Sequence, residues 1–213
     1  RCIRDRLSPN RIKFLYHKNT LVEEHIAGIP GDVFLEEYLP LPETNKIRMA
    51  KEFVKFNERC FARLLGDMRS YNFVIDITPD IEDYQYRMRA IDFDQQSYEG
   101  RKNLYLPQFY RENYEYVELV LKTLSPEVIK QYQMEEQSAM AYRAVASRKQ
   151  LMELLSIMIK DELSEYHKIK MLREELNEHF QTSYFSTCST MGTIVKRQLK
   201  LVLQKHLQQI VTG

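Results

Sequence analysis

The chain has 213 residues, which is enough to bury a sizeable hydrophobic core in one large domain or two small ones. Hydrophobic residues make up 44% of the sequence and charged residues 29%, a balance that is typical of globular proteins and excludes a disordered or fibrous chain. The net charge of +1 argues against a broad electrostatic surface for nucleic acid or for an anionic membrane.

Cysteine usage and the start of the chain bear on the cellular compartment. Cys2, Cys60 and Cys188 are far apart and form no C-x-x-C pair, so we expect neither a disulfide framework nor a zinc site. No signal-peptide core follows the first residue, and no apolar stretch is long enough to span a bilayer. We therefore expect a cytoplasmic protein without a membrane span. Because the chain begins with Arg1 rather than Met, we also expect a piece of a longer protein.

The first 66 residues change from strand patterns to a helix pattern. Residues 12–16 and 20–26 are predicted strands, with Lys18 and Asn19 as the turn between them. Residues 27–32 then interrupt the strand pattern. Over residues 44–64 the buried-type residues recur every three or four positions, which predicts an amphipathic helix that ends near Gly66. The residues that define this face are Ile47, Ala50, Val54, Asn57, Phe61 and Leu64.

A β-hairpin follows the helix, and the rest of the chain is mostly helical. Residues 72–77 and 86–92 are predicted strands around an acidic turn, and residues 95–108 are predicted to be irregular. The order of strands, long helix, hairpin and further helices predicts an α+β fold with segregated elements rather than a doubly wound sheet.

Four local signals define the helical part. Tyr114, Val117, Leu121 and Leu124 are predicted to share an apolar face. Ser125 and Pro126 predict an N-cap followed by Pro at the first helical position. Ser147 and Gln150 predict a capping box before an apolar face. A break at residues 182–190 precedes a last helix. The apolar residues of these last two helices are Leu151, Leu154, Leu155, Met158, Ile194, Val195, Leu199, Val202 and Leu203.

Three oxygen-bearing side chains are predicted to converge at one end of the hairpin. Asp67 follows the long helix, Asn72 stands at the start of the first strand, and Asp92 ends the returning strand. A hairpin brings the ends of its strands together, so Asn72 and Asp92 should lie close to each other, with Asp67 on the loop that leads into them. Hard oxygen ligands held in this way suit Mg²⁺, which keeps waters and shares its coordination with phosphate.

The motifs Gly66-Asp67-x-x-x-x-Asn72 and Asp92-Phe93-Asp94 resemble the catalytic loop and metal-binding loop of the protein-kinase-like superfamily. They are most similar to its small-molecule branch, the aminoglycoside and choline kinases. Residues 21–28 look like the last N-lobe strand and hinge of that superfamily, and the resemblance covers about residues 12–98. Leu65 replaces the His of the small-molecule branch, and Asp94 stands where protein kinases have Gly.

The resemblance implies a kinase-like fold in which residues 1–40 are a remnant of the N-lobe strands and hinge and residues 41–213 are the helical C-lobe. It implies ATP and Mg²⁺ as cofactors, and a nucleotide and an unidentified hydroxylated acceptor, of small-molecule type, as partners; we expect no nucleic-acid partner. The implied roles are proton acceptance or orientation of the acceptor for Asp67, contact with the transferred phosphate for Arg69, metal binding for Asn72 and Asp92, and adenine binding by the main chain around Glu24, His25 and Ile26.

The departures from the superfamily leave two other interpretations open. The sequence contains neither a Gly-rich phosphate loop nor a credible strand Lys, so most of the N-lobe is expected elsewhere in a longer chain. A pseudokinase that binds nucleotide or acts as a scaffold without phosphotransfer is the first alternative. A helical interaction protein with a chance motif is the second, because Asp67 can also cap a turn and Arg69 can be a solvated surface residue.

Overall fold

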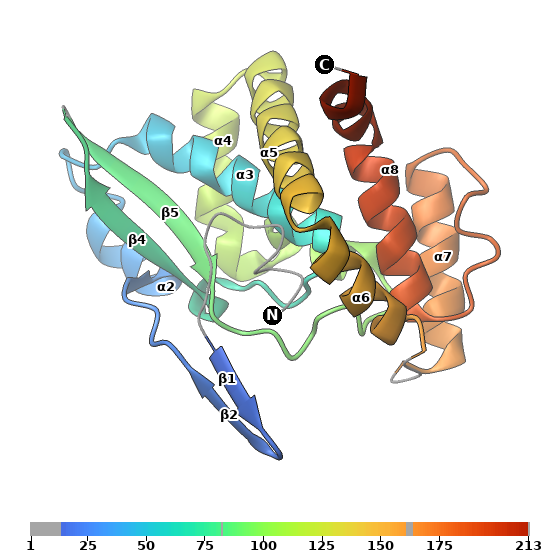
Figure 1. Cartoon of the computed structure of the whole chain (residues 1–213). Helices are drawn as coiled ribbons and strands as arrows, with labels where there is room; N and C mark the ends of the chain where they lie inside the picture. Colours follow the sequence, from blue (N-terminus) through green and yellow to red (C-terminus); the bar gives the residue numbers. More distant parts are fainter. Residues whose placement is uncertain (1–13, 82, 161–163, 213) are drawn as a thin grey trace.

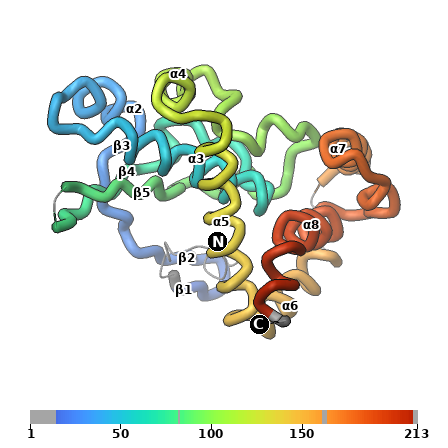
Figure 2. The backbone as a smooth tube through the Cα atoms, turned by 90° about the horizontal axis from the view of Figure 1, so that it is seen from above, coloured from blue at the N-terminus to red at the C-terminus, as the bar shows by residue number. Residues whose placement is uncertain are grey.

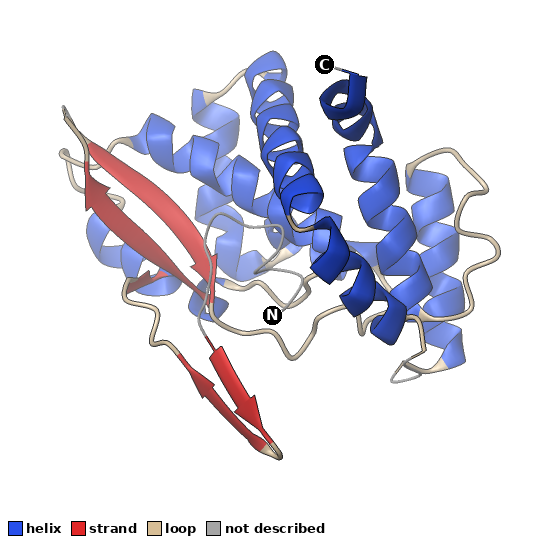
Figure 3. Cartoon of the chain, in the orientation of Figure 1, coloured by secondary structure: helices blue, strands red, loops and turns tan. Residues whose placement is uncertain are grey.

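A computed structural model describes residues 14–81, 83–160 and 164–212 of the chain. All the strands lie in the N-terminal half, around one long helix, and the remainder is helical, which confirms the predicted α+β class (Figures 1 and 3). Cys2, the first two residues of the predicted strand 12–16, and Glu82 of the acidic turn lie outside the described residues. The strands are β1 (Phe14–His17), β2 (Thr20–Glu23), β3 (Ile29–Pro30), β4 (Phe73–Pro79) and β5 (Tyr84–Ala90).

Helical elements follow β3 and then dominate the chain. A short turn of helix, α2 (Gly31–Val33), continues into the π-helix η1 (Phe34–Tyr38). The longer helices are α3 (Lys46–Arg63), α4 (Tyr114–Thr123), α5 (Pro126–Ala146), α6 (Arg148–Met158), α7 (Tyr166–His179) and α8 (Met191–Thr212). Single 3₁₀ turns occur at η2 (Ser70–Asn72), η3 (Lys102–Tyr105), η4 (Pro107–Phe109) and η5 (Arg111–Asn113).

The strands form two separate antiparallel sheets. β1 pairs with β2 around the predicted turn, where Lys18 adopts a φ of 51°. The second sheet has the order β3-β4-β5, and β4 pairs with β5 from Phe73 opposite Ala90 to Pro79 opposite Tyr84. The predicted hairpin is therefore confirmed, although β5 begins and ends two residues earlier than predicted. β3 was not predicted, because two residues within a Gly- and Pro-rich segment carry no strand pattern.

The β1–β2 hairpin projects away from the second sheet and exposes apolar side chains (Figure 1). Leu15, Tyr16, Leu21 and Val22 are between 44 and 75% exposed. The second strand ends at Glu23 rather than at Ile26, so residues 24–28 form a linker that leads from the hairpin to β3.

Helix α3 is the central element of the fold (Figure 2), where it contacts β5, α4, α5 and α8. Its N-cap is Asn45, whose side chain accepts the N–H of Arg48 at 3.0 Å. The predicted face is confirmed at all positions except Ile47, which is 50% exposed. The helix ends at Leu64 in a left-handed conformation, φ 52°, rather than at the predicted Gly66.

The helical part confirms most of the local signals. The side chain of Ser125 accepts the N–H of Val128, and Pro126 begins α5 as predicted. Ser147 stands at the start of α6 without a side-chain capping bond, so the predicted capping box is wrong. The predicted face of α4 is confirmed only in part: Leu124 is buried and Val117 is half-buried against the core, whereas Tyr114 and Leu121 are exposed. The other buried residues of the helix are Tyr116, Leu119 and Val120.

Two hydrophobic cores share α3. One core joins the sheet, the first part of α3 and α4, and includes Phe34, Phe53, Phe73 and Tyr116. The other joins the end of α3 to α5, α6, α7 and α8, and it contains the predicted apolar faces of α6 and α8. Among the described helices, none is both long and apolar enough to cross a membrane. Cys60 and Cys188 are buried free thiols.

A buried ion cluster, which we call the Arg59 cluster, ties α3 to β5 and α5. The guanidinium of Arg59 lies 2.5 Å from Glu52 and 3.2 Å from Glu136, and it also donates to the carbonyl of Met88 at 3.2 Å. Glu52 in turn accepts the N–H of Met88 at 2.9 Å. Burial alone would lower the pKa of Arg59, but the two carboxylates raise it above its ordinary value. The cluster fixes the position of the hairpin relative to the central helix.

Candidate functional site

The candidate site begins where α3 ends. The left-handed turn at Leu64 directs the chain back along the segment that follows β5, and Leu65 forms an isolated antiparallel bridge with Gln96. The N–H of Gly66 donates to the carbonyl of Gln95 at 3.2 Å, and a Cβ at this position would lie only 3.0 Å from the same oxygen. This close backbone approach places Asp67 next to the segment that carries Asp92.

Asp67 is held in a left-handed conformation, φ 54°, that a non-glycine residue adopts only when its surroundings stabilise it. Its backbone N–H donates to the hydroxyl of Tyr110 at 2.9 Å. Its carbonyl accepts the side-chain amide of Asn72 at 2.7 Å, and the same amide lies 3.2 Å from the carboxylate. The predicted proximity of Asp67 and Asn72 is therefore present as direct contact.

Arg69 occupies one side of the Asp67 carboxylate. Its Nε donates to Oδ1 of Asp67 at 2.8 Å, and its Nη1 lies 2.9 Å from Glu112. These contacts, led by the hydrogen bond to Asp67, raise the pKa of Arg69, which stays a cation. The guanidinium also lies over the ring of Tyr110, 5.4 Å from its centre. All of these side chains remain partly open to solvent, and we call Asp67, Arg69, Asn72, Tyr110 and Glu112 the Asp67 cluster.

Asp92 lies beside the Asp67 cluster because of the backbone pairing of the hairpin. The N–H of Ile91 donates to the carbonyl of Asn72 at 3.0 Å, so Asp92 follows directly after the last pairing of the two chains. Oδ1 of Asp92 accepts the N–H of Asp94 at 3.1 Å. Desolvation and the nearby carboxylate of Asp92 raise the pKa of Asp94, and the charge of Asp67 adds to this effect. Negative charge therefore gathers at the end of the hairpin.

The donor set at this end consists of oxygen atoms. The described residues contain no ready-made group of three or more His, Cys, Asp or Glu side chains that could hold a metal ion. Asn72 and Asp92 are one amide and one carboxylate. Because the amide nitrogen of Asn72 is directed at Asp67, its Oδ1 is the atom left for a ligand. Two such ligands suit a metal that takes the rest of its coordination from water and phosphate.

The predicted adenine-contact residues lie in a different part of the chain. Glu24 and His25 are exposed and Ile26 is half-buried, and all three belong to the linker between β2 and β3. β3 pairs antiparallel with β4, with Ile29 opposite Ile75 and Pro30 opposite Val74, so the linker joins the sheet at Ile75, inside β4. The linker thus reaches the sheet as a separate segment from the Asp67 cluster.

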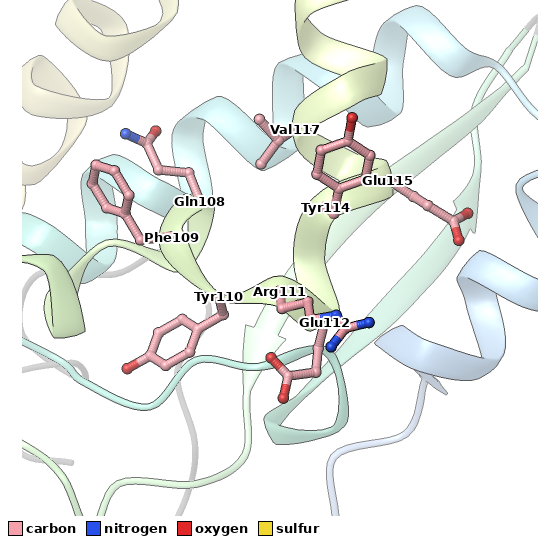
Figure 4. Close-up of a pocket in the computed structure, with 8 residues that line it drawn as sticks. All are labelled: Gln108, Phe109, Tyr110, Arg111, Glu112, Tyr114, Glu115 and Val117. Atoms are coloured by element: carbon pink, nitrogen blue, oxygen red, sulfur yellow. The ribbon is translucent and has the colours of Figure 1, made fainter.

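An open pocket of about 580 Å³ adjoins the cluster, and Figure 4 shows the side chains that line it. Phe109 and Tyr114 line it, and each is more than half exposed. Tyr110 and Glu112 belong both to this pocket and to the Asp67 cluster. The other lining residues are Gln108, Arg111, Glu115 and Val117.

Sequence reasoning missed the contribution of residues 110–113 to the site. Besides Tyr110 and Glu112, the fully buried Asn113 donates its side-chain amide to the carbonyls of Met68 and Pro107, both at 2.8 Å. This amide fixes the loop of Asp67 to the segment that forms the pocket. The dense run of aromatic residues before α4 was the available signal, but nothing in its spacing pointed to the loop more than 40 residues upstream.

Comparison of the chain with protein-family models, with curated proteins and with solved structures found no match.

Proposed function

We propose that the protein is the hinge and C-lobe of a kinase-like, ATP- and Mg²⁺-dependent phosphotransferase that moves the γ-phosphoryl group to a hydroxyl of a small-molecule acceptor. One observation carries the proposal: Asn72 holds both the backbone and the carboxylate of Asp67, while the hairpin brings Asp92 to the same end of the sheet. A general base on the loop after α3, an amide at the start of β4 and a second carboxylate just after β5 are the groups that phosphoryl transfer uses.

The roles follow from what each side chain can do. Asp67 orients the acceptor hydroxyl and takes its proton through the carboxylate. Asn72 and Asp92 would hold Mg²⁺, which when bound would neutralise charge on the ATP phosphates. Arg69 lies close enough to Asp67 to meet the transferred phosphoryl group with its guanidinium. Most of the rate enhancement would come from positioning and from charge neutralisation.

The acceptor is proposed to enter from the pocket beside Asp67. Support comes from the two residues that the pocket shares with the Asp67 cluster, Tyr110 and Glu112, because Tyr110 also contacts the proposed base, Asp67.

Nucleotide is proposed to bind on the other side, between the hairpin end and the linker, with the main chain of Glu24, His25 and Ile26 contacting adenine. The remaining strands of an N-lobe would pack on the exposed apolar side chains of the β1–β2 hairpin. A cytoplasmic setting, proposed from the thiols, supplies ATP and Mg²⁺.

A pseudokinase is the second candidate, and one contact favours it. Arg69 donates to Oδ1 of Asp67 and the amide of Asn72 lies near Oδ2, so an acceptor hydroxyl would have to compete with these two contacts for the carboxylate. In this case the site would keep nucleotide but transfer no phosphoryl group.

The test compares wild type with Asp92→Ala and Asp67→Asn in the intact protein. Asp92→Ala should weaken Mg·ATP binding by about 1–3 kcal/mol, because a contact to a charged group is lost, and should abolish phosphotransfer. Asp67→Asn should leave Mg·ATP binding unchanged and lower turnover, since Asp67 acts on the acceptor. Calorimetry measures the affinity for Mg·ATP, and ATP consumption with a panel of hydroxylated small molecules measures turnover.

Asp76→Ala is the matched control. Asp76 lies on β4, away from the hairpin end. It is half-buried and forms an ion pair with Arg89 of β5 at 3.6 Å. It should change neither quantity. Wild-type protein that binds Mg·ATP but consumes none with the whole panel would establish the pseudokinase instead. Asp92→Ala that binds as tightly as wild type would end the metal-ligand assignment.

A further inference from the structure

Tyr110 reaches Asp67 from a segment 43 residues further along the chain. Its hydroxyl accepts the backbone N–H of Asp67 at 2.9 Å and donates its own proton to the carbonyl of Leu104 at 2.7 Å. A tyrosine hydroxyl has one proton to donate and can still accept a hydrogen bond, so both contacts can exist at once. Burial raises the pKa of Tyr110 to about 12, which keeps the proton in place at neutral pH.

The hydroxyl acts at the strained point of the loop. Asp67 has a left-handed backbone, and its N–H must be satisfied in that conformation or the conformation loses support. The loop continues into Arg69, and the segment of Tyr110 also controls that residue: the Tyr110 ring lies under the guanidinium, and Glu112 binds its far end. Figure 4 shows the Tyr110 ring extending away from Tyr114, with its hydroxyl end pointing out of the group of pocket side chains.

From this geometry we infer that Tyr110 is a positioning residue for Asp67. Its hydroxyl sets the backbone conformation that aims the carboxylate of Asp67 toward the acceptor side, and its ring supports the arginine beside that carboxylate. The inference rests on the proposed function, because it assigns Tyr110 to the base of that reaction. Small displacements of a reacting group are costly: a shift of about 1 Å can lower the rate about 100-fold.

The test is Tyr110→Phe, which removes only the hydroxyl. Tyr105→Phe is the matched control, because the Tyr105 hydroxyl also donates to a backbone carbonyl, that of Glu99 at 2.5 Å, without contacting Asp67. Both variants should lower the melting temperature. In Tyr110→Phe, the turnover of ATP with an acceptor from the panel should fall about 10- to 100-fold with the affinity for Mg·ATP unchanged. In Tyr105→Phe, turnover should stay within about twofold of wild type.

A second measurement separates the two proposals. Hydrogen exchange of the Asp67 amide, followed by NMR, should be slow in wild type and in Tyr105→Phe, and faster in Tyr110→Phe. Fast exchange in wild type, or equal turnover in wild type and Tyr110→Phe, would overturn the positioning role while leaving phosphotransfer intact. An equal loss of turnover in both variants would also overturn it, since the loss would then follow stability alone. Absence of phosphotransfer from wild type, with the amide still protected by Tyr110, would instead overturn the proposed function.

Discussion

The Arg59 cluster and the Asp67 cluster are two arginine–carboxylate networks, the first centred on α3 and the second on the loop that follows α3. Arg59 binds Glu52 and Glu136 in the interior, where its side chain is 4% exposed. Arg69 binds Asp67 and Glu112 at the surface, where its side chain is 39% exposed. Each arginine bridges two carboxylates, so the chemistry of the two networks is nearly the same and the solvent exposure differs.

The difference in solvent exposure indicates different roles for the two networks. A buried ion pair is costly to break, because removal of one partner leaves a charge without water. An exposed pair contributes little to stability, but it can be reached by a ligand. We therefore assign the Arg59 cluster to the fold, where it joins β5 and α5 to α3, and the Asp67 cluster to the candidate site.

Arg59→Ala should have the largest effect on stability. It leaves Glu52 and Glu136 buried without their cation, and the loss should be about 3–5 kcal/mol in the free energy of unfolding, measured by urea denaturation. Lys55→Ala is the control, because Lys55 also joins α3 to α5, through Glu135 at 3.1 Å, but at the surface. That variant should lose no more than about 1 kcal/mol. Similar losses in the two variants would contradict the distinction between the networks.

Asn113→Ala should have the next largest effect, because Asn113 is the buried connection between the Asp67 loop and the pocket. Its removal leaves the carbonyls of Met68 and Pro107 without their donor, at a cost of about 1–3 kcal/mol in the free energy of unfolding. Asn103→Ala, an exposed asparagine on η3, is the control and should be near neutral. Stability unchanged in Asn113→Ala would show that the loop holds its place without this amide.

The sequence predicted the elements of the Asp67 cluster better than their partners. Asp67, Asn72 and Asp92 could be grouped because a helix end and a hairpin are local patterns, and the geometry of a hairpin fixes which ends meet. Tyr110 and Asn113 could not be grouped with them, because their contacts span more than 40 residues and depend on how the segment before α4 folds. The same limit applies to the fold as a whole, since helices and strands follow local periodicity whereas the docking of α3 between two cores depends on contacts distant in sequence.

The buried charges of α3 were the largest omission. From Phe56 to Arg63 every residue of the helix is buried, so its second half has no solvent face even though it contains Glu58, Arg59 and Arg63. A sequence pattern assigns charged residues to the outside by default, and burial of these three depends on partners that the pattern does not show. Arg59 is satisfied by Glu52, Glu136 and the carbonyl of Met88, Glu58 accepts from Gln137, and Arg63 donates to the carbonyl of Arg59.

Glu58→Gln should sharpen the comparison through pH. Burial, with the charge of Glu136 as a minor cause, raises the pKa of Glu58 above 4.5. The folded state then binds the proton more tightly than the unfolded state, so this group's contribution to stability is complete below pH 4.5 and is lost as pH rises through the folded pKa. The Gln side chain can still accept from Gln137, which lies 2.8 Å away, without carrying a charge.

The measurement for Glu58→Gln is the difference in unfolding free energy between variant and wild type, across pH 4 to 8 by urea denaturation. The difference should move in favour of the variant as pH rises, by less than the loss in Asn113→Ala. A difference that stays constant over this range would show that Glu58 titrates with the same pKa in the folded and unfolded states.

Arg69→Gln should have the smallest effect on stability and the most informative effect on the site. Its ion pairs with Asp67 and Glu112 are exposed, so the free energy of unfolding should fall by about 0–1 kcal/mol, and the difference should shrink at high salt. Arg87→Gln, an exposed arginine on β5, is the control for stability and should be neutral.

The turnover of Arg69→Gln distinguishes three roles for Arg69. Lower turnover at unchanged Mg·ATP affinity would support contact with the transferred phosphoryl group, and higher turnover would show that Arg69 restrains Asp67 in wild type. Unchanged turnover would assign Arg69 to the solvated surface. A loss of stability as large as that of Arg59→Ala would contradict the comparison itself, because it would mean that the Asp67 cluster also holds the fold together.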